Sequence, residues 1–279
     1  MTKQLTDEQL AAFTRDGFVV VPAFYDLEEI ETIQRGIHSI IGLVIEEVGL
    51  SIEQPAFSSE AFDCGYQELI AHNRALGGRI YDAVKQIPCF MRLVASAKHE
   101  SVVRQVRMTD QPAIAAGGYG IRIDNPSEGK FRAGWHQDYP AQIRSMDGLV
   151  FWSPLLTVIE ELGPVELCVG SHHGGLVPVH TTHPEDSSRV GAYALVLKDE
   201  AELVAKYQTV APLTCPGDLL LLDFLTLHRG GENRSTRARW SMQMRWFNFN
   251  EPTGVRLGWQ GGYAVGNDLK SVHPELVVD

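Results

Sequence analysis

The chain has 279 residues, 44% of them hydrophobic, and a formal net charge of −11, so it can bury a full core as one large domain or as two small ones. The acidic charge argues against nucleic acid and anionic membranes as partners, and no apolar run is long enough to cross a bilayer. The polar start shows no signal peptide and the four cysteines show no paired spacing, so we expect a cytoplasmic protein without a structural zinc site.

The first part of the chain is predicted to be mostly helical. Thr6 and Gln9 have the spacing of a capping box, and Gly17 is placed to end the short helix that follows. Asp26 then precedes a long amphipathic helix, with further helices expected over about 66–86 and 89–97. We interpret these helices as a layer that packs against one sheet of a β core.

From about residue 102 the pattern changes to short strands separated by turn residues. Strands are expected over 118–124, 147–155, 165–169, 219–225 and 237–247. Short strands without regular βαβ alternation predict an antiparallel sandwich, and a double-stranded β-helix, or jelly roll, satisfies that pattern. No internal repeat divides the chain. The predicted class is therefore mainly β with flanking helices, in a single domain.

His136 and Asp138 stand two residues apart, so in an extended strand both side chains point into one cavity. Gln137 points away, unless the chain bends at 139–140. A third ligand must come from another strand, and His228, after a buried apolar run, is the candidate. Two imidazoles and one carboxylate can cover one face of an iron(II) ion and leave its other positions open. An isolated His-x-Asp pair, however, is more often a surface pair or a satisfied histidine than a metal site.

The run over 237–247 strengthens the metal interpretation, because it alternates strictly between polar and apolar residues. Arg239 and Ser241 share its polar face, which needs partners if both faces are covered. A guanidinium presents a planar fork of donors that matches a carboxylate. The Arg239-x-Ser241 pair is therefore a candidate for holding the distal carboxylate of a dicarboxylic cosubstrate.

In this order and spacing, the motifs resemble the Fe(II)/2-oxoglutarate-dependent dioxygenases of the phytanoyl-CoA dioxygenase family. The matching pieces are the segment 5–21, His136-Gln137-Asp138, the segment 163–172, His228, the segment 233–235 and Arg239. The resemblance covers nearly the whole chain. It implies a cupin-like jelly-roll core over about 106–250, with a helical part over about 1–105 packed on it.

The resemblance also implies the cofactors. Fe(II) is held by His136, Asp138 and His228, and the C5 carboxylate of the cosubstrate 2-oxoglutarate pairs with Arg239, helped by Ser241. O2 takes the remaining iron position. Related halogenases carry Gly or Ala in place of the aspartate, so Asp138 disfavours halogenation.

Three further residues enter the set of candidate cofactor-binding residues: Arg122, Gln137 and Trp152. Arg122 is either an exposed strand residue or a pocket residue, and Trp152 either belongs to the core or contacts the substrate. The loop 178–192 is either a lid over the site or a solvated linker, and the tail 254–279 shows no pattern that indicates a role.

The expected reaction is hydroxylation of an unactivated C–H bond in a small molecule or natural-product intermediate, with release of succinate and CO2. Desaturation, epoxidation or ring closure use the same iron centre. A non-catalytic cupin-like binding module does not require all four site residues, and a zinc hydrolase lacks a nearby general-base glutamate. Four arginines expected near the pocket allow a small polar or zwitterionic substrate: Arg122, Arg132, Arg144 and Arg245. No pattern indicates the oligomeric state.

Overall fold

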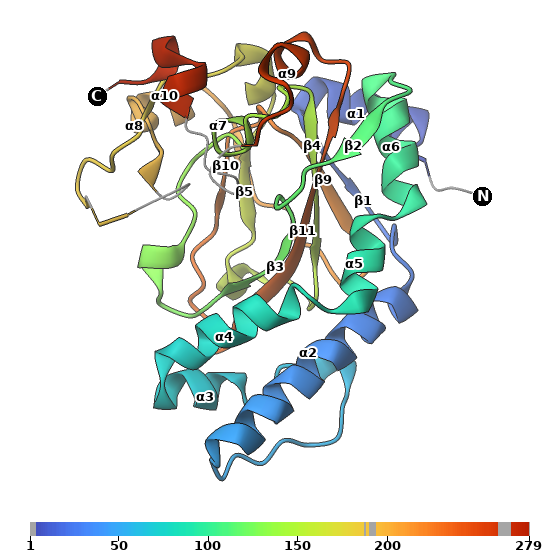
Figure 1. Cartoon of the computed structure of the whole chain (residues 1–279), viewed down its shortest axis with the longest axis vertical. Coiled ribbons are helices and arrows are strands. Elements are labelled where there is room, and N and C mark those ends of the chain that lie inside the picture. The colour runs from blue at the N-terminus through green and yellow to red at the C-terminus, as the bar shows by residue number, and fades with distance from the viewer. Residues whose placement is uncertain (1–3, 187, 190–193, 262–268, 279) are drawn as a thin grey trace.

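The computed structural model describes residues 4–186, 188–189, 194–261 and 269–278. Within these residues the strands form a large antiparallel sheet in the order β1-β9-β4-β11-β2, with β3 also paired to β11 (Figure 1). Its strands are β1 (Phe18–Val21), β2 (Pro112–Ile114), β3 (Gly120–Asp124), β4 (Gly148–Pro154), β9 (Leu219–Asp223) and β11 (Arg239–Asn248).

The described residues also form two smaller antiparallel sheets. One has the order β10-β5-β8, and the other pairs β6 with β7. Their strands are β5 (Val165–Cys168), β6 (Val179–His180), β7 (Val196–Leu197), β8 (Thr209–Val210) and β10 (His228–Gly230). The prediction of antiparallel sheets with flanking helices is therefore confirmed.

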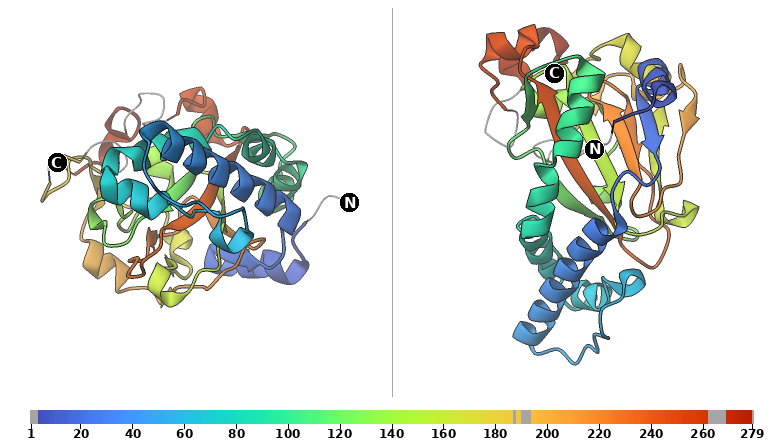
Figure 2. Two further views of the ribbon diagram at one scale, coloured as in Figure 1. Left: turned by 90° about the horizontal axis from the view of Figure 1, so that it is seen from below. Right: turned by 90° about the vertical axis from the view of Figure 1, so that its right-hand side faces the viewer.

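Most of the helical layer comes from the N-terminal part of the chain. The helices α2, α3 and α4 lie together beyond one end of the large sheet, whereas α5 and α6 run along it (Figures 1 and 2). Contacts join α6 to β11 and β2, and α4 to β3. These helices are α1 (Asp7–Asp16), α2 (Leu27–Val48), α3 (Tyr66–His72), α4 (Arg74–Val84), α5 (Pro88–Val94) and α6 (Ala97–Arg107). The short helices α7 (Tyr139–Gln142), α8 (Glu200–Val204), α9 (Pro252–Leu257) and α10 (Leu269–Val272) come later in the chain. None of the described helices is long and apolar enough to cross a membrane.

Both faces of the large sheet are covered, and the two alternating sets of side chains on β11 therefore have different neighbours. Its apolar face packs into one core cluster with the isoleucine stripe of α2. The opposite face of the sheet, with Val150 and Leu222, packs against Val165 and Leu167 of the small β10-β5-β8 sheet in a second cluster. Each fully buried aliphatic side chain contributes roughly 1.5–3 kcal/mol. The polar face of β11 is thus enclosed between two sheets.

Three predicted helix ends are confirmed. Thr6 and Gln9 form a capping box at the start of α1, and Gly17 ends that helix in the left-handed region with φ 82°. Asp26 caps α2, which extends over 22 residues. By contrast, the prediction that strands begin at about residue 102 is wrong, because α6 continues to Arg107.

The two metal-ligand segments also differ from the prediction. His136 is not in a strand but forms an isolated antiparallel bridge with His228. Asp138 is already helical, with φ −71° and ψ −34°, because α7 begins at the next residue with Pro140 in its first turn. Proline cannot donate to a strand ladder, so it favours this helical turn. His228 begins β10 rather than ending the apolar run of β9.

Candidate metal and cosubstrate site

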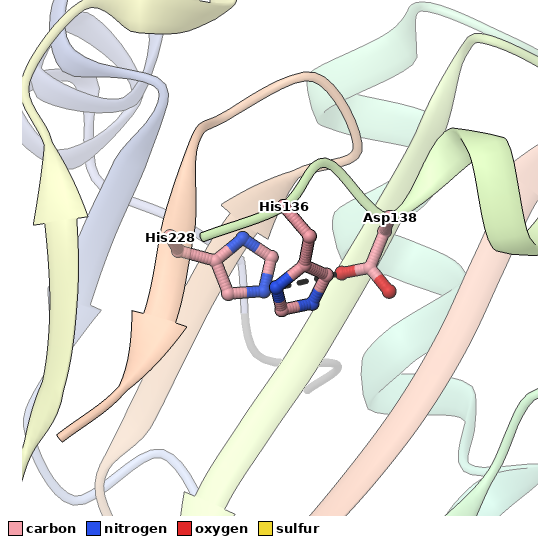
Figure 3. Close-up of side chains that lie close together, drawn as sticks. All are labelled: His136, Asp138 and His228. Atoms are coloured by element: carbon pink, nitrogen blue, oxygen red, sulfur yellow. Dashed lines mark ion pairs between the residues drawn. The ribbon is translucent and has the colours of Figure 1, made fainter. Parts of the chain in front are cut away.

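The bridge between His136 and His228 brings their side chains together. The amide of each residue donates to the carbonyl of the other, at 2.9 and 3.0 Å. The amide of Asp138 donates to the Phe224 carbonyl at 2.9 Å, which ties the start of α7 to the turn after β9. The three side chains therefore converge (Figure 3), and one ligand atom from each lies within 4.8 Å of the others.

Both histidines have the tautomer that a metal needs. Nδ1 of His136 lies 2.8 Å from the Gly134 carbonyl, and Nδ1 of His228 lies 2.9 Å from the Thr226 carbonyl. Because a carbonyl only accepts, each Nδ1 carries the proton and each Nε2 presents its lone pair. Burial, together with the neighbouring His228, lowers the pKa of His136 to about 3. This imidazole is therefore neutral at physiological pH.

Asp138 supplies the third donor as an ionised carboxylate. Burial raises its pKa, but Arg245 and the two imidazoles outweigh burial and hold the pKa below its usual value. Oδ1 accepts a hydrogen bond of 2.7 Å from Nε of Arg245. Oδ2 is buried without a hydrogen-bond partner in the described structure and lies 3.5 Å from Nε2 of His228. Since a buried anionic oxygen is costly when unpaired, these residues fit a divalent cation, and two histidines with one carboxylate suit iron(II).

A cavity of about 440 Å³ opens onto these three side chains. The large sheet lines one side of it with Val150, Trp152 and Leu222. The small sheet contributes Val165 and Gly230 to the lining. The cavity thus lies between the two sheets, with the metal ligands in its wall.

Arg239 forms a second polar centre in the same cavity. Its side chain is 2% exposed, and its Nη2 donates to Oδ2 of Asp124 at 2.8 Å. Its Nε and Nη1, and the Ser241 hydroxyl, are buried with no hydrogen-bond partner among the described residues. Arg122 donates to the other Asp124 oxygen at 2.7 Å. Burial raises the pKa of Asp124, but the two arginines outweigh burial and lower it. The Arg239 guanidinium, held by Asp124 and with its Nε and Nη1 unpaired within the described structure, is suited to bind a carboxylate ligand.

The structure brings most of the predicted site residues together. His136, Asp138, His228, Arg239, Arg122 and Trp152 all line the cavity. Ser241 lies opposite Arg122 in the β11–β3 register, next to the lining rather than in it.

Gln137 is not among the cavity-lining residues. Its side-chain amide donates to the carbonyls of Gly175 and Leu225, both at 2.8 Å, and accepts from the Val177 amide at 3.1 Å. These bonds engage the whole amide group. The structure therefore gives Gln137 a role in tying loops together rather than in contacting a cofactor.

Other cavity residues were only partly foreseen. Arg132 and Arg245 line the cavity as expected, but Arg144 does not and donates instead to Ala116 and Gln142. The contact between Arg245 and Asp138 was missed, although alternation places Arg245 on the polar face of β11. His183 and Arg189, from the described part of the loop 178–192, also line the cavity. Residues 187 and 190–192 of that loop lie outside the described residues.

A partly buried two-histidine, one-carboxylate centre beside an unsatisfied arginine, between two antiparallel sheets, is the arrangement expected of a non-haem iron oxygenase. The sequence pattern of the phytanoyl-CoA dioxygenase (PhyH) family matches residues 13–241. The chain therefore belongs to this family of dioxygenases, as its motifs predicted. No curated protein sequence matches the chain.

Similar solved structures agree with this fold. EctD from S. alaskensis, with 2-oxoglutarate and 5-hydroxyectoine, has a TM-score of 0.57 at 18% identity, covering 95% of this chain and 87% of its own. SnoK, a non-haem alpha-ketoglutarate-dependent carbocyclase from nogalamycin biosynthesis, has a TM-score of 0.56 at 17% identity, covering 95% of both chains. The epimerase SnoN from the same biosynthesis has a TM-score of 0.53 at 16% identity, covering 90% of this chain and 87% of its own. At these identities the similarity establishes the fold alone.

Proposed function

We propose that the protein is an Fe(II)- and 2-oxoglutarate-dependent oxygenase. In this proposal it hydroxylates an unactivated C–H bond of a small molecule or natural-product intermediate and releases succinate and CO2. The observation that carries the proposal is the position of Arg239. Two of its buried nitrogens lack partners within the described structure, and its guanidinium faces the cavity that holds the His-Asp-His cluster.

Each site residue has a role that follows from its contacts. His136 and His228 hold the iron through Nε2, and Asp138 holds it through Oδ2. Arg239 pairs with the C5 carboxylate of 2-oxoglutarate, with the Ser241 hydroxyl and Arg122 beside it. A charge-assisted hydrogen bond of this kind contributes about 1.5–3 kcal/mol. When bound, iron, 2-oxoglutarate and O2 together supply the oxidising power, and the cavity walls orient the substrate and exclude water.

The same proposal includes the finer fold. The large sheet and the β10-β5-β8 sheet form a double-stranded β-helix, or cupin-like jelly roll, over about 106–250. The helical part over about 1–105 packs on it, so that 1–279 is a single domain. The support is that both sheets contribute apolar side chains to one cluster and residues to one cavity. Trp152, at 4% exposed, forms part of the cavity wall on the large sheet.

The similar structures name several outcomes of such chemistry. One contains a hydroxylated product, 5-hydroxyectoine, while others are an epimerase and a carbocyclase. We propose hydroxylation as the principal reaction and keep desaturation or cyclisation at the same centre as the second candidate. The alternative of a non-catalytic binding module does not explain why two buried nitrogens of Arg239 are unpaired beside the metal-ligand cluster.

Oxygen labelling tests the proposal. The protein is incubated with Fe(II), 2-oxoglutarate, ¹⁸O₂ and a panel of small polar compounds and natural-product intermediates. Hydroxylation places one labelled atom in succinate and one in the product. Desaturation or cyclisation labels succinate but leaves the product unlabelled. A binding module, or a hydrolase, forms no succinate under any of these conditions.

A further inference from the structure

Arg245 binds one of the two carboxylate oxygens of Asp138. It lies on β11, and its Nε donates to Oδ1 of Asp138 at 2.7 Å. The rest of its guanidinium is held by the Gly118 carbonyl at 3.3 Å and by Oε1 of Gln243 at 3.4 Å. The side chains of Arg245 and Asp138 are 15% and 3% exposed. The pair is therefore largely shielded from water.

This contact divides the two carboxylate oxygens of Asp138 between two tasks. Oδ1 is engaged by Arg245, whereas Oδ2 is buried without a partner in the described structure and lies beside Nε2 of His228. A free carboxylate can bind a divalent ion through one oxygen or through both. An octahedral ion held by two imidazoles and one carboxylate oxygen keeps three positions open. A second carboxylate oxygen would fill one of those positions.

We propose that Arg245 is a positioning residue that fixes Asp138 as a single-oxygen ligand and so keeps the coordination position that the cosubstrate needs. The proposal rests on the proposed function. It adds a residue outside the His-Asp-His motif to the metal centre, and it assigns that residue an effect on cosubstrate binding rather than on metal capture. The positive charge of Arg245 also compensates the buried Asp138 carboxylate when no metal is bound, so the site is already formed before a metal binds.

A purely structural role for Arg245 is the competing explanation. The chain contains a matched pair for this comparison, Arg107 with Asp223, whose side chains lie 2.7 Å apart and are 13% and 9% exposed. Neither residue lines the cavity. Arg107 also pairs with Asp147 at 3.0 Å, so the variant Arg107→Met removes at least as much buried ion pairing as Arg245→Met and leaves the cavity lining unchanged.

Co(II) titration separates the two explanations. Cobalt is a visible-absorbing stand-in for Fe(II) that does not require exclusion of oxygen. Metal-free wild type, Arg245→Met, Arg245→Lys and Arg107→Met are titrated with Co(II) and then with 2-oxoglutarate. In Arg245→Met we expect Co(II) to bind with an altered visible spectrum and 2-oxoglutarate to bind about tenfold more weakly. Lysine should restore part of the affinity, and Arg107→Met should bind both as wild type does.

If Arg245→Met has the same Co(II) spectrum and the same affinity for 2-oxoglutarate as wild type, the proposal is overturned. A wild-type protein that binds Co(II) but not 2-oxoglutarate would instead contradict the proposed function, and the Co(II) spectra of the Arg245 variants would still report on Asp138. The two failures are therefore distinguishable.

Chemical rescue provides a test that does not depend on Arg245→Met folding alone. In Asp138→Ala the guanidinium of Arg245 loses its carboxylate partner and faces the vacated ligand position. Added formate should bind there and restore Co(II) and 2-oxoglutarate binding. The double variant Asp138→Ala/Arg245→Met should not be rescued. Equal rescue of both variants, or rescue of neither, would overturn the proposal.

Discussion

At the scale of single residues, the chemistry depends on which atoms the fold leaves without partners. Oδ2 of Asp138 and two nitrogens of Arg239 are buried and unsatisfied within the described structure, which is costly unless a ligand completes them. Motif spacing identified both residues. It could not identify the state of each atom, because this depends on Arg245 and Asp124, which lie far away in the sequence.

Replacing Asp138 by alanine should abolish turnover and weaken Fe(II) binding, since it removes the charged ligand. Succinate formation and equilibrium metal binding measure the two effects. Unchanged turnover in the variant would reject the proposed metal triad.

Replacing Arg239 by alanine should raise the concentration of 2-oxoglutarate needed for half-maximal rate. Loss of a charge-assisted pair of about 1.5–3 kcal/mol corresponds to roughly 10- to 150-fold. The measurement is succinate formation against 2-oxoglutarate concentration, with the exposed Arg234→Ala as control. If Arg239→Ala leaves this requirement unchanged, another residue anchors the C5 carboxylate.

At the scale of helices and strands, the sequence was sufficient to predict features that depend only on neighbouring residues. The capping box of α1 and the alternation of β11 were both readable from the chain. The segment with His136 and Asp138 was misassigned to a strand, because its single bridge to β10 is a long-range contact and because Pro140 favours the turn of α7. Val102 and Val103, which suggested the start of a strand, lie in the middle of α6. They are buried in the core cluster that α6 shares with the large sheet, and this tertiary contact explains their composition.

Helix α6 carries a buried histidine that should make stability depend on pH. Burial lowers the pKa of His99 to about 3, and its Nε2 lies 2.8 Å from the Tyr25 hydroxyl. Below its unfolded pKa of about 6.5, the unfolded chain takes up a proton that the folded chain does not, so stability falls as pH decreases from about 6.5 towards 3. At pH 5 the loss is about 2 kcal/mol.

Urea unfolding of the metal-free protein at pH 7.5 and pH 5 measures this loss. The variant His99→Gln retains a hydrogen-bonding group but does not titrate in this range. We expect wild type to lose about 2 kcal/mol more than the variant between the two pH values. Equal losses would show that His99 does not remain neutral in the fold.

At the scale of the whole molecule, an acidic chain encloses an arginine-rich cavity. The net charge is −11, yet six arginines among the described residues line the cavity: Arg122, Arg132, Arg189, Arg229, Arg239 and Arg245. Overall charge therefore gave no information on the charge of the cavity. Antiparallel sheets with flanking helices were predictable from strand and turn patterns. The motif residues of the cavity were predictable as well, but the rest of its lining was not, because it combines side chains from both sheets and from the loop 178–192.

Metal binding should stabilise the whole fold, because the ion joins the segment with His136 and Asp138 to His228, which is far away in the sequence. At a free Fe(II) concentration about 100 times the Kd, the gain is about 2.7 kcal/mol. Anaerobic thermal unfolding should show a Tm several degrees higher with Fe(II), by about 2–4 °C for each kcal/mol. Asp138→Ala should show little of this shift, and an equal shift in that variant would place the stabilising metal elsewhere.

The most direct test of the central claim is an anaerobic titration of the metal-free protein with Fe(II) and then with 2-oxoglutarate. The measured quantity is the weak visible metal-to-ligand charge-transfer absorption of the cosubstrate on iron. We predict a band that appears only after both additions and bleaches when oxygen is admitted, in wild type but not in Asp138→Ala. A folded wild-type protein that binds Fe(II) and gives no band with 2-oxoglutarate would contradict the claim and favour a binding module.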